Sequence, residues 1–269
     1  MPRLKKIVIQ GLEPLFNLIS RLLSNSRLWY PASRGVLNEA RVRTKIVAHN
    51  GATLRFHVPN DRCLFRADSF LTKEPETLRW IDGFQDNAVF WDIGACVGTY
   101  TIYAALTKNA RVVAVEPSIF NLEWLARNVH SNNVESNVTI VPLALTSEPQ
   151  MADFKMQVLE WGGALSSFGV DYDHEGLSFQ SRFVYPTIGA NGSFLIDSFN
   201  LPEPKHLKID VDSIEHLVLL GLLPHLSEVK SIALENSRNV EVVRSCADLL
   251  EKIGFAVKES GRANTIWER

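Results

Sequence analysis

Cysteine is scarce in this chain of 269 residues, which contains only Cys63, Cys96 and Cys246. The three lie far apart and form no Cys-x-x-Cys pair, so we expect no disulfide framework. This usage favours a reducing compartment, and we therefore expect a cytoplasmic location.

An excess of positive charge is also missing. The chain has 28 Lys and Arg residues against 30 Asp and Glu residues, a net charge of −2, so no global basic field attracts nucleic acid. We find no internal repeat and no low-complexity tract. The apolar fraction of 46% is that of a globular protein, and the length fits one α/β domain with an N-terminal extension.

Long apolar runs are absent even from the N-terminal segment, where basic residues are followed by an amphipathic pattern. The apolar residues at helical spacing are Leu12, Leu15, Phe16, Ile19, Leu22 and Leu23. The run is too short and too polar to span a bilayer, and it makes a poor secretory signal. We expect residues 1–40 to form a helical extension and residues 41–269 to form the main domain. The helix either caps the domain or pairs with a second copy, or it lies on an anionic membrane surface such as the inner face of the membrane.

The most informative stretch is an apolar run that ends in an acid and a glycine turn, Asp92–Gly98, before a helix expected over residues 99–108. Its spacing, Asp-x-Gly-x-x-x-Gly, is neither the dinucleotide fingerprint Gly-x-Gly-x-x-Gly nor a phosphate loop, which needs a lysine. An acid at the strand tip would repel a pyrophosphate. It suits a ligand that carries an ammonium group and a sulfonium group.

A second acid follows the next expected strand, residues 111–115, which ends in Glu116-Pro117. A carboxylate at this place can accept hydrogen bonds from both hydroxyls of a ribose. After a third strand, residues 138–141, a turn puts Ala144 where an adenine would lie. On the helix expected over residues 119–129, Asn121 and Asn128 can be exposed residues and nothing more.

Residues 147–200 are less regular, and we expect a substrate lid there, with a mobile loop over residues 161–169. The strand that follows carries Lys208 and Asp210 on the same side, and the next one ends in Glu235 and Asn236. The carboxyl ends of parallel strands form the ligand-binding edge of open α/β sheets. Asp210, Glu235 and Asn236 also offer oxygen ligands for Mg²⁺, but we favour a site without metal.

Together these segments resemble the FkbM family of S-adenosylmethionine-dependent O-methyltransferases. The matching pieces are residues 73–77, residues 91–98, Glu116-Pro117 with Asn121, and residues 207–215. The resemblance implies a class I methyltransferase (Rossmann-like) fold: a mostly parallel sheet of seven strands, with one antiparallel strand near the C-terminus, flanked by helices. It also implies methyl transfer from S-adenosylmethionine to a hydroxyl of a sugar, glycolipid or related small molecule.

The resemblance further implies a set of site residues. The expected cofactor-binding residues are Asp92, Gly94, Ala95, Gly98, Glu116, Pro117, Ala144, Glu76 and Thr77. Asp210 is expected to act as base or orienting group, tuned by Lys208, unless the two residues merely pair with each other. Cys96 stands where the family usually has asparagine and Ser213 where it has glycine, which marks a divergent member or one with weakened activity.

Two other classes of protein remain open. A nicotinamide-dependent oxidoreductase can use a similar sheet, although the spacing of the glycine turn disfavours it. A scaffold that kept the fold while Cys96 and Ser213 drifted is the other alternative. Binding of S-adenosylhomocysteine rather than NADH would separate these cases.

Overall fold

The computed structural model describes the chain except for residues 1–13, 16, 23, 25, 28 and 213, and divides into two compact units, Met1–Arg43 and Thr44–Arg269. The first unit contains α2 (Trp29–Val42), and residues 14–15 and 17–22 are also helical. Of the apolar residues expected on the N-terminal helix, Leu12, Phe16 and Leu23 lie outside the described residues. Among the described residues, no helix has the length and apolar character that crossing a membrane requires.

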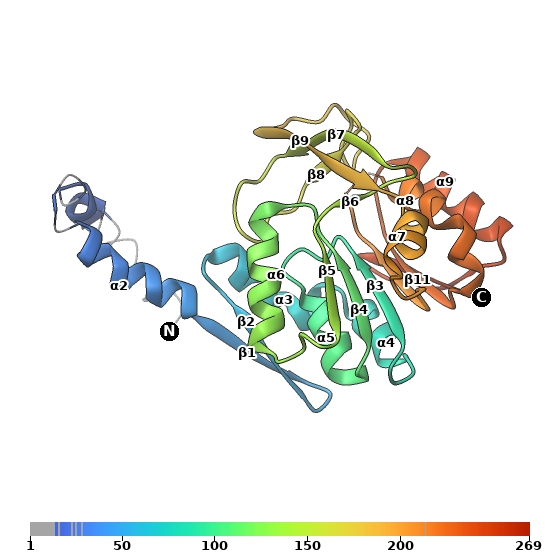
Figure 1. The fold of residues 1–269 in the computed structure, drawn as a ribbon, viewed down its shortest axis with the longest axis horizontal. Helices are drawn as coiled ribbons and strands as arrows, with labels where there is room; N and C mark the ends of the chain where they lie inside the picture. The colour runs from blue at the N-terminus through green and yellow to red at the C-terminus, as the bar shows by residue number, and fades with distance from the viewer. Residues whose placement is uncertain (1–13, 16, 23, 25, 28, 213) are drawn as a thin grey trace. The chain divides into compact units, whose positions relative to one another are not determined.

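A seven-stranded sheet forms the centre of the second unit, in the order β12-β13-β11-β10-β3-β4-β5 (Figure 1). Its strands are β3 (Val89–Ile93), β4 (Arg111–Val115), β5 (Val138–Val141), β10 (His206–Ile209), β11 (Ser231–Glu235), β12 (Ala256–Ser260) and β13 (Asn264–Glu268). The pairs from β11 to β5 are parallel, whereas β13 runs antiparallel to both β11 and β12. The expected mostly parallel sheet with one antiparallel strand near the C-terminus is confirmed.

Helices cover both faces of this sheet, as expected. They are α3 (Asp61–Lys73), α4 (Pro75–Asp82), α5 (Thr99–Lys108), α6 (Ile119–Ser131), α7 (Gly192–Phe199), α8 (Glu215–Leu222) and α9 (Val240–Lys252), with a short 3-10 helix, η1 (Leu223–Glu228). Neighbouring residues of β3 point to opposite faces: Phe90 joins the core shared with α4, α5 and α6, and Trp91 joins the core shared with α7, α8 and α9. Such burial on both faces is typical of parallel sheets.

A β-hairpin begins the second unit, with β1 (Thr44–His49) and β2 (Ala52–His57) joined at Asn50 and Gly51, both at positive φ. Asn128 of α6 holds this hairpin: its Oδ1 accepts from the backbone N–H of His57, and its Nδ2 donates to the carbonyl of Val97, both at 2.8 Å. The alternative that Asn121 and Asn128 are merely exposed helix residues is therefore wrong, because both are buried and bonded to backbone groups of other segments.

A second, four-stranded sheet lies between β5 and β10 in the chain, where we expected an irregular segment. It contains β6 (Ala144–Leu145), β7 (Gln150–Met156), β8 (Ser166–Phe168) and β9 (Phe183–Ala190), in the order β6-β9-β7-β8 (Figure 1). Apolar residues such as Met151 and Ile188 are exposed on these strands, so the alternation of apolar and polar residues is weak. The mobile loop expected over residues 161–169 accordingly includes a strand at residues 166–168.

We expect Asn128→Ala to destabilise the protein by about 2–4 kcal/mol, because it leaves a buried N–H and a buried C=O unpaired. Urea unfolding measures this loss. His130→Ala, at an exposed position of the same helix, is the matched control and should change stability by less than about 0.5 kcal/mol. Equal effects of the two variants would contradict the structural role of Asn128.

Candidate active site

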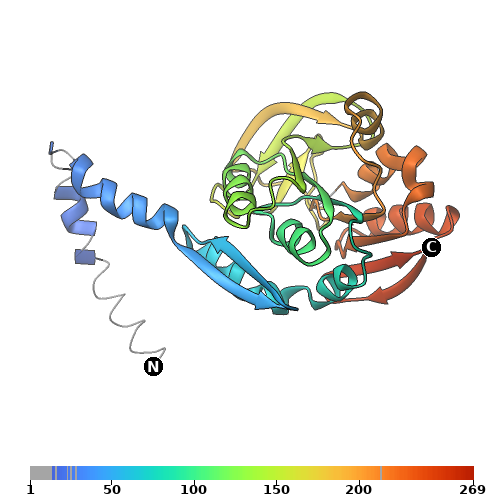
Figure 2. The same ribbon diagram turned by 60° about the horizontal axis from the view of Figure 1, so that its bottom comes forward.

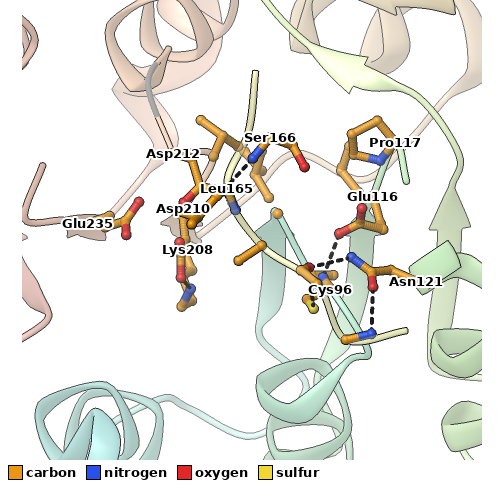
Figure 3. Close-up of a pocket in the computed structure, with 18 of the residues that line it drawn as sticks. Cys96, Glu116, Pro117, Asn121, Leu165, Ser166, Lys208, Asp210, Asp212 and Glu235 are labelled. Carbon is orange, nitrogen blue, oxygen red and sulfur yellow. Dashed lines mark hydrogen bonds and ion pairs between the residues drawn. The ribbon is translucent and has the colours of Figure 1, made fainter. Parts of the chain in front are cut away.

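A cavity of about 330 Å³ opens at the carboxyl ends of β3, β4 and β10 (Figure 3). Seven of the residues expected at the site line it: Gly94, Ala95, Glu116, Pro117, Ala144, Lys208 and Asp210. They come from four separate segments of the chain. The structure thus brings together most of the residues that the sequence singled out.

The turn after β3 forms one wall of the cavity and requires glycine at its first position. Gly94 has a φ of +83°, and its amide donates to the carbonyl of Val115 at 2.9 Å. A Cβ atom on Gly94 would lie 1.8 Å from the carbonyl oxygen of Asp210, so only glycine lets β3 and β10 come this close. Two residues further on, Cys96 has a left-handed φ of +52°, a conformation more costly for cysteine than for asparagine.

Glu116 lies at the end of β4 and faces the turn. Its Oε2 accepts from the backbone N–H of Cys96 at 2.7 Å, and its Oε1 accepts from that of Ser118 at 2.8 Å. Burial raises the pKa of Glu116 to about 7, although these amides act in the opposite direction. Each carboxylate oxygen has a further lone pair, so Glu116 can still accept hydrogen bonds from a ligand in the cavity.

A buried ion pair lies at the end of β10. The Nζ of Lys208 donates to Oδ2 of Asp210 at 2.5 Å, and Lys208 also lies over the ring of Tyr100. Burial would raise the pKa of Asp210, but Lys208 and then Lys73 outweigh it and hold that pKa well below its ordinary value. Asp210 is therefore a carboxylate at any physiological pH.

Glu235, at the end of the neighbouring strand β11, has the opposite character. Burial, and then repulsion from Asp210, raise its pKa well above the ordinary value, and its Oε2 has no hydrogen-bond partner among the described residues. Two carboxyl groups whose pKa values are shifted in opposite directions thus share this corner of the cavity. Their environments, rather than their chemical type, set this difference.

Four of the expected cofactor residues do not line the cavity. Asp92 is buried and accepts from the hydroxyl of Thr101 at 2.6 Å, while its other oxygen has no partner among the described residues. Gly98 precedes α5 at a φ of +83°, packed so closely against Leu125 that a Cβ would lie 2.5 Å from it. Both residues support the turn from outside the cavity.

Glu76 and Thr77 are the other two expected cofactor residues that do not line the cavity, and they connect α4 to β13. Glu76 accepts from the backbone N–H groups of Ala263 and Asn264 at 2.7 and 3.0 Å, and Thr77 accepts from the side chain of Asn264 at 3.0 Å. Figure 2 shows α4 beside the C-terminal strands. From the same segment, Glu74 lines the cavity, where its Oε1 pairs with Lys73 at 2.6 Å.

A loop over residues 162–166 completes the cavity and is held at two places. Asn121 accepts from the backbone N–H of Gly162 and donates to the carbonyl of Gly163, both at 3.0 Å. Asp212, at a φ of +66°, accepts from the backbone N–H groups of Leu165 and Ser166 at 2.8 and 3.2 Å (Figure 3). The sequence had suggested no such role for either residue, because these bonds join segments more than 40 residues apart. Ser213 lies outside the described residues.

The alternative magnesium site includes Asn236, but the side chain of this residue is hydrogen-bonded to other segments. Its Nδ2 donates to the carbonyl of Gly261 at 3.0 Å, and its Oδ1 accepts from the hydroxyl of Thr265 at 2.7 Å. In the part of the chain that the structure describes, no three or more His, Cys, Asp or Glu side chains are grouped to hold a metal ion.

A family model described as the methyltransferase FkbM domain matches residues 92–253, more than half of the chain. The hexuronic acid methyltransferase AglP of Haloferax volcanii is 22% identical over 206 residues, which cover 76% of this chain and 80% of that protein.

Two solved structures show a more distant likeness. Precorrin-6Y C5,15-methyltransferase from Geobacter metallireducens GS-15 has 18% identity and a TM-score of 0.45, covering 73% of this chain and 86% of that one. M. jannaschii TYW2, solved in complex with AdoMet, has 12% identity and a TM-score of 0.38, covering 84% of this chain and 86% of that one. So distant a likeness carries no functional argument.

We expect Gly94→Ala to destabilise the protein by about 3 kcal/mol or more, because the new Cβ meets the Asp210 carbonyl in addition to the strain of positive φ. Gly51→Ala is the matched control: its φ is +78° but no atom lies within 4 Å of the added Cβ. This control should cost only about 1 kcal/mol. Urea unfolding compares them, and equal losses would show that the close approach to Asp210 is unimportant.

Proposed function

This chain belongs to the FkbM methyltransferase domain family and is a methyltransferase, and we propose that it transfers a methyl group from S-adenosylmethionine to a hydroxyl of a sugar, glycan or related small molecule. The observation that carries the proposal is the single cavity in which the Gly94 turn, the Glu116 carboxylate and the Asp210–Lys208 pair meet. The AglP relative, whose name specifies a hexuronic acid, supports a sugar acceptor.

The residues of the cavity fit this cofactor. The free lone pairs of Glu116 suit the two ribose hydroxyls, and Pro117 and Ala144 offer apolar contact for the adenine. The turn at Gly94 and Ala95 approaches without side-chain bulk, which suits the methionine part. Glu74, buried beside Lys73, offers a carboxylate for the ammonium group.

Asp210 acts on the acceptor. S-adenosylmethionine would supply an activated methyl group, whose carbon the acceptor oxygen attacks in one step while the C–S bond breaks and S-adenosylhomocysteine leaves. Asp210 orients the acceptor hydroxyl and takes its proton as the new O–CH3 bond forms. Lys208 holds the carboxylate ionised and in place. Because its pKa is low, Asp210 is a weak base, so orientation is its larger contribution.

The loop over residues 162–166 serves as the lid of this site in the proposal. Its bonds to Asn121 and Asp212 hold it over the cavity, where it excludes water and surrounds the reacting groups. The surrounding segment, residues 147–200, supplies three of the four strands of the small second sheet, and the loop lies between two of them, β7 and β8.

We expect the affinity for S-adenosylhomocysteine to rise about 10-fold between pH 6 and pH 8. The Glu116 pKa is about 7, and the ribose hydroxyls bind the ionised carboxyl, so below pH 7 binding must first remove a proton. Isothermal titration at several pH values measures this.

Glu116→Gln should bind more weakly and without this pH dependence. Glu215→Gln is the matched control, because Glu215 is also buried with a pKa raised to about 7 by burial but does not line the cavity. It should keep the wild-type profile. A wild-type affinity that is constant from pH 6 to pH 8 would remove Glu116 from the binding site.

We expect Asp210→Asn to keep its affinity for S-adenosylhomocysteine within a few fold and to lose about 100-fold or more in turnover. Transfer of radiolabelled methyl groups to a panel of monosaccharides measures turnover, and thermal unfolding checks the variant, since Lys208 loses its partner. Asp248→Asn, which is exposed on α9, is the control and should remain fully active. Normal turnover of a folded Asp210→Asn protein would exclude the proposed role.

A further inference from the structure

Arg66 is a cation in the cavity wall that lacks an acidic partner. Its Nε donates to the carbonyl of Gly162 at 2.8 Å, and the side chain lines the cavity. Among the described residues, no carboxylate oxygen lies within 4.0 Å of its guanidinium, and the two terminal amino groups make no hydrogen bond. A partly buried guanidinium with free donors is unusual, because arginine away from water is normally paired.

The other cations of the cavity are all paired. Arg62 pairs with Glu160 at 3.0 Å, Lys73 with Glu74 at 2.6 Å, and Lys208 with Asp210 at 2.5 Å. Among the described residues that line the cavity, Arg66 is thus the cation without an acidic partner, so its charge is available to a ligand. Cys96 first, and then Asp210 and Asp212, raise the Arg66 pKa against the effect of burial, so the guanidinium stays charged.

The helix that carries Arg66 presents a whole face to the cavity. Arg62, Phe65 and Arg66 all line it, at the spacing i, i+3, i+4 that places side chains on one side of a helix. Phe65 is 61% exposed, so a large aromatic ring is available to a ligand in the same cavity as the free guanidinium. An aromatic ring offers an apolar surface for the C–H face of a sugar, and the planar fork of arginine matches an oxyanion.

We infer that the acceptor is a sugar bearing an acidic group, a carboxylate or a phosphate, and that Arg66 binds this group while Phe65 packs against the sugar ring. The inference rests on the proposed function, since it concerns the acceptor of the same site. Arg66 and the acidic group form two charge-assisted hydrogen bonds, between the terminal amino groups of Arg66 and two oxygens of the acid.

The methionine carboxylate of the cofactor is the competing partner for Arg66. The acceptor is the better match, because the exposed Phe65 shares a helix face with Arg66, and because Asp210, the group that orients the acceptor hydroxyl, lines the same cavity. Arg66 also bonds the lid at Gly162, so an acid bound there meets the lid as it covers the acceptor.

Binding of three matched probes to the complex of the full chain with S-adenosylhomocysteine tests the inference. The probes are methyl glucuronoside, methyl glucoside 6-phosphate and the neutral methyl glucoside, and isothermal titration measures each affinity. Wild-type protein should bind at least one acidic probe about 10-fold or more tightly than the neutral one, and the preferred acid identifies carboxylate or phosphate as the group recognised.

Arg66→Gln should abolish this preference while leaving the affinities for S-adenosylhomocysteine and for methyl glucoside unchanged. Arg66→Lys should restore only part of it, because an ammonium lacks the bidentate fork. Arg244→Gln, an exposed arginine on α9, is the control and should behave as wild type.

Three results would overturn the inference. They are a wild-type protein without preference for either acidic probe, an Arg66→Gln protein that loses affinity for all three probes equally, and one that loses affinity for S-adenosylhomocysteine. The second would mean that Arg66 only holds the lid, and the third that it binds the cofactor. Failure of the wild-type chain to bind S-adenosylhomocysteine at all would instead overturn the proposed function, and the inference with it.

Discussion

The contact between Gly94 and the backbone of Asp210 is the constraint on which the site depends. A methyl group at residue 94 would overlap the carbonyl oxygen of Asp210, so the turn after β3 and the end of β10 can meet only because residue 94 has no side chain. This contact places the expected cofactor turn next to the acid that is proposed to orient the acceptor. The residues proposed to bind the cofactor and to orient the acceptor are therefore brought together by backbone packing, which is stiffer than any arrangement of side chains.

The three buried acids of this site differ in their pKa values. Lys208 lowers the pKa of Asp210, whereas burial raises the pKa of Glu235 and sets that of Glu116 near neutrality. The cavity can thus offer carboxyl groups of lowered, near-neutral and raised pKa at one sheet edge. Such separation of pKa values among neighbouring carboxyl groups is common at functional sites.

The fold was largely predictable because its signals are local. Buried parallel strands are short apolar runs, and those at residues 111–115 and 138–141 have the expected bounds. The small second sheet was only partly predictable, because apolar residues are exposed on its strands and these pair across long separations, as Met151 does with Ile188. Asn121 and Asn128 were misjudged for a related reason, since an asparagine on a helix has the same local pattern whether it is exposed or bonded to a distant backbone.

Residue spacing along the chain was enough to indicate an α/β fold, the resemblance to the methyltransferase family and the row of polar residues at the strand ends. Periodicity and turn chemistry are properties of neighbouring residues, so a linear sequence contains them. The sequence did not reveal that Glu76 and Thr77 support β13 while Glu74 lines the cavity, or that Arg66 is left without an acidic partner. Burial and pairing of a charge depend on which distant segments pack around it, and that is settled only when the chain has folded.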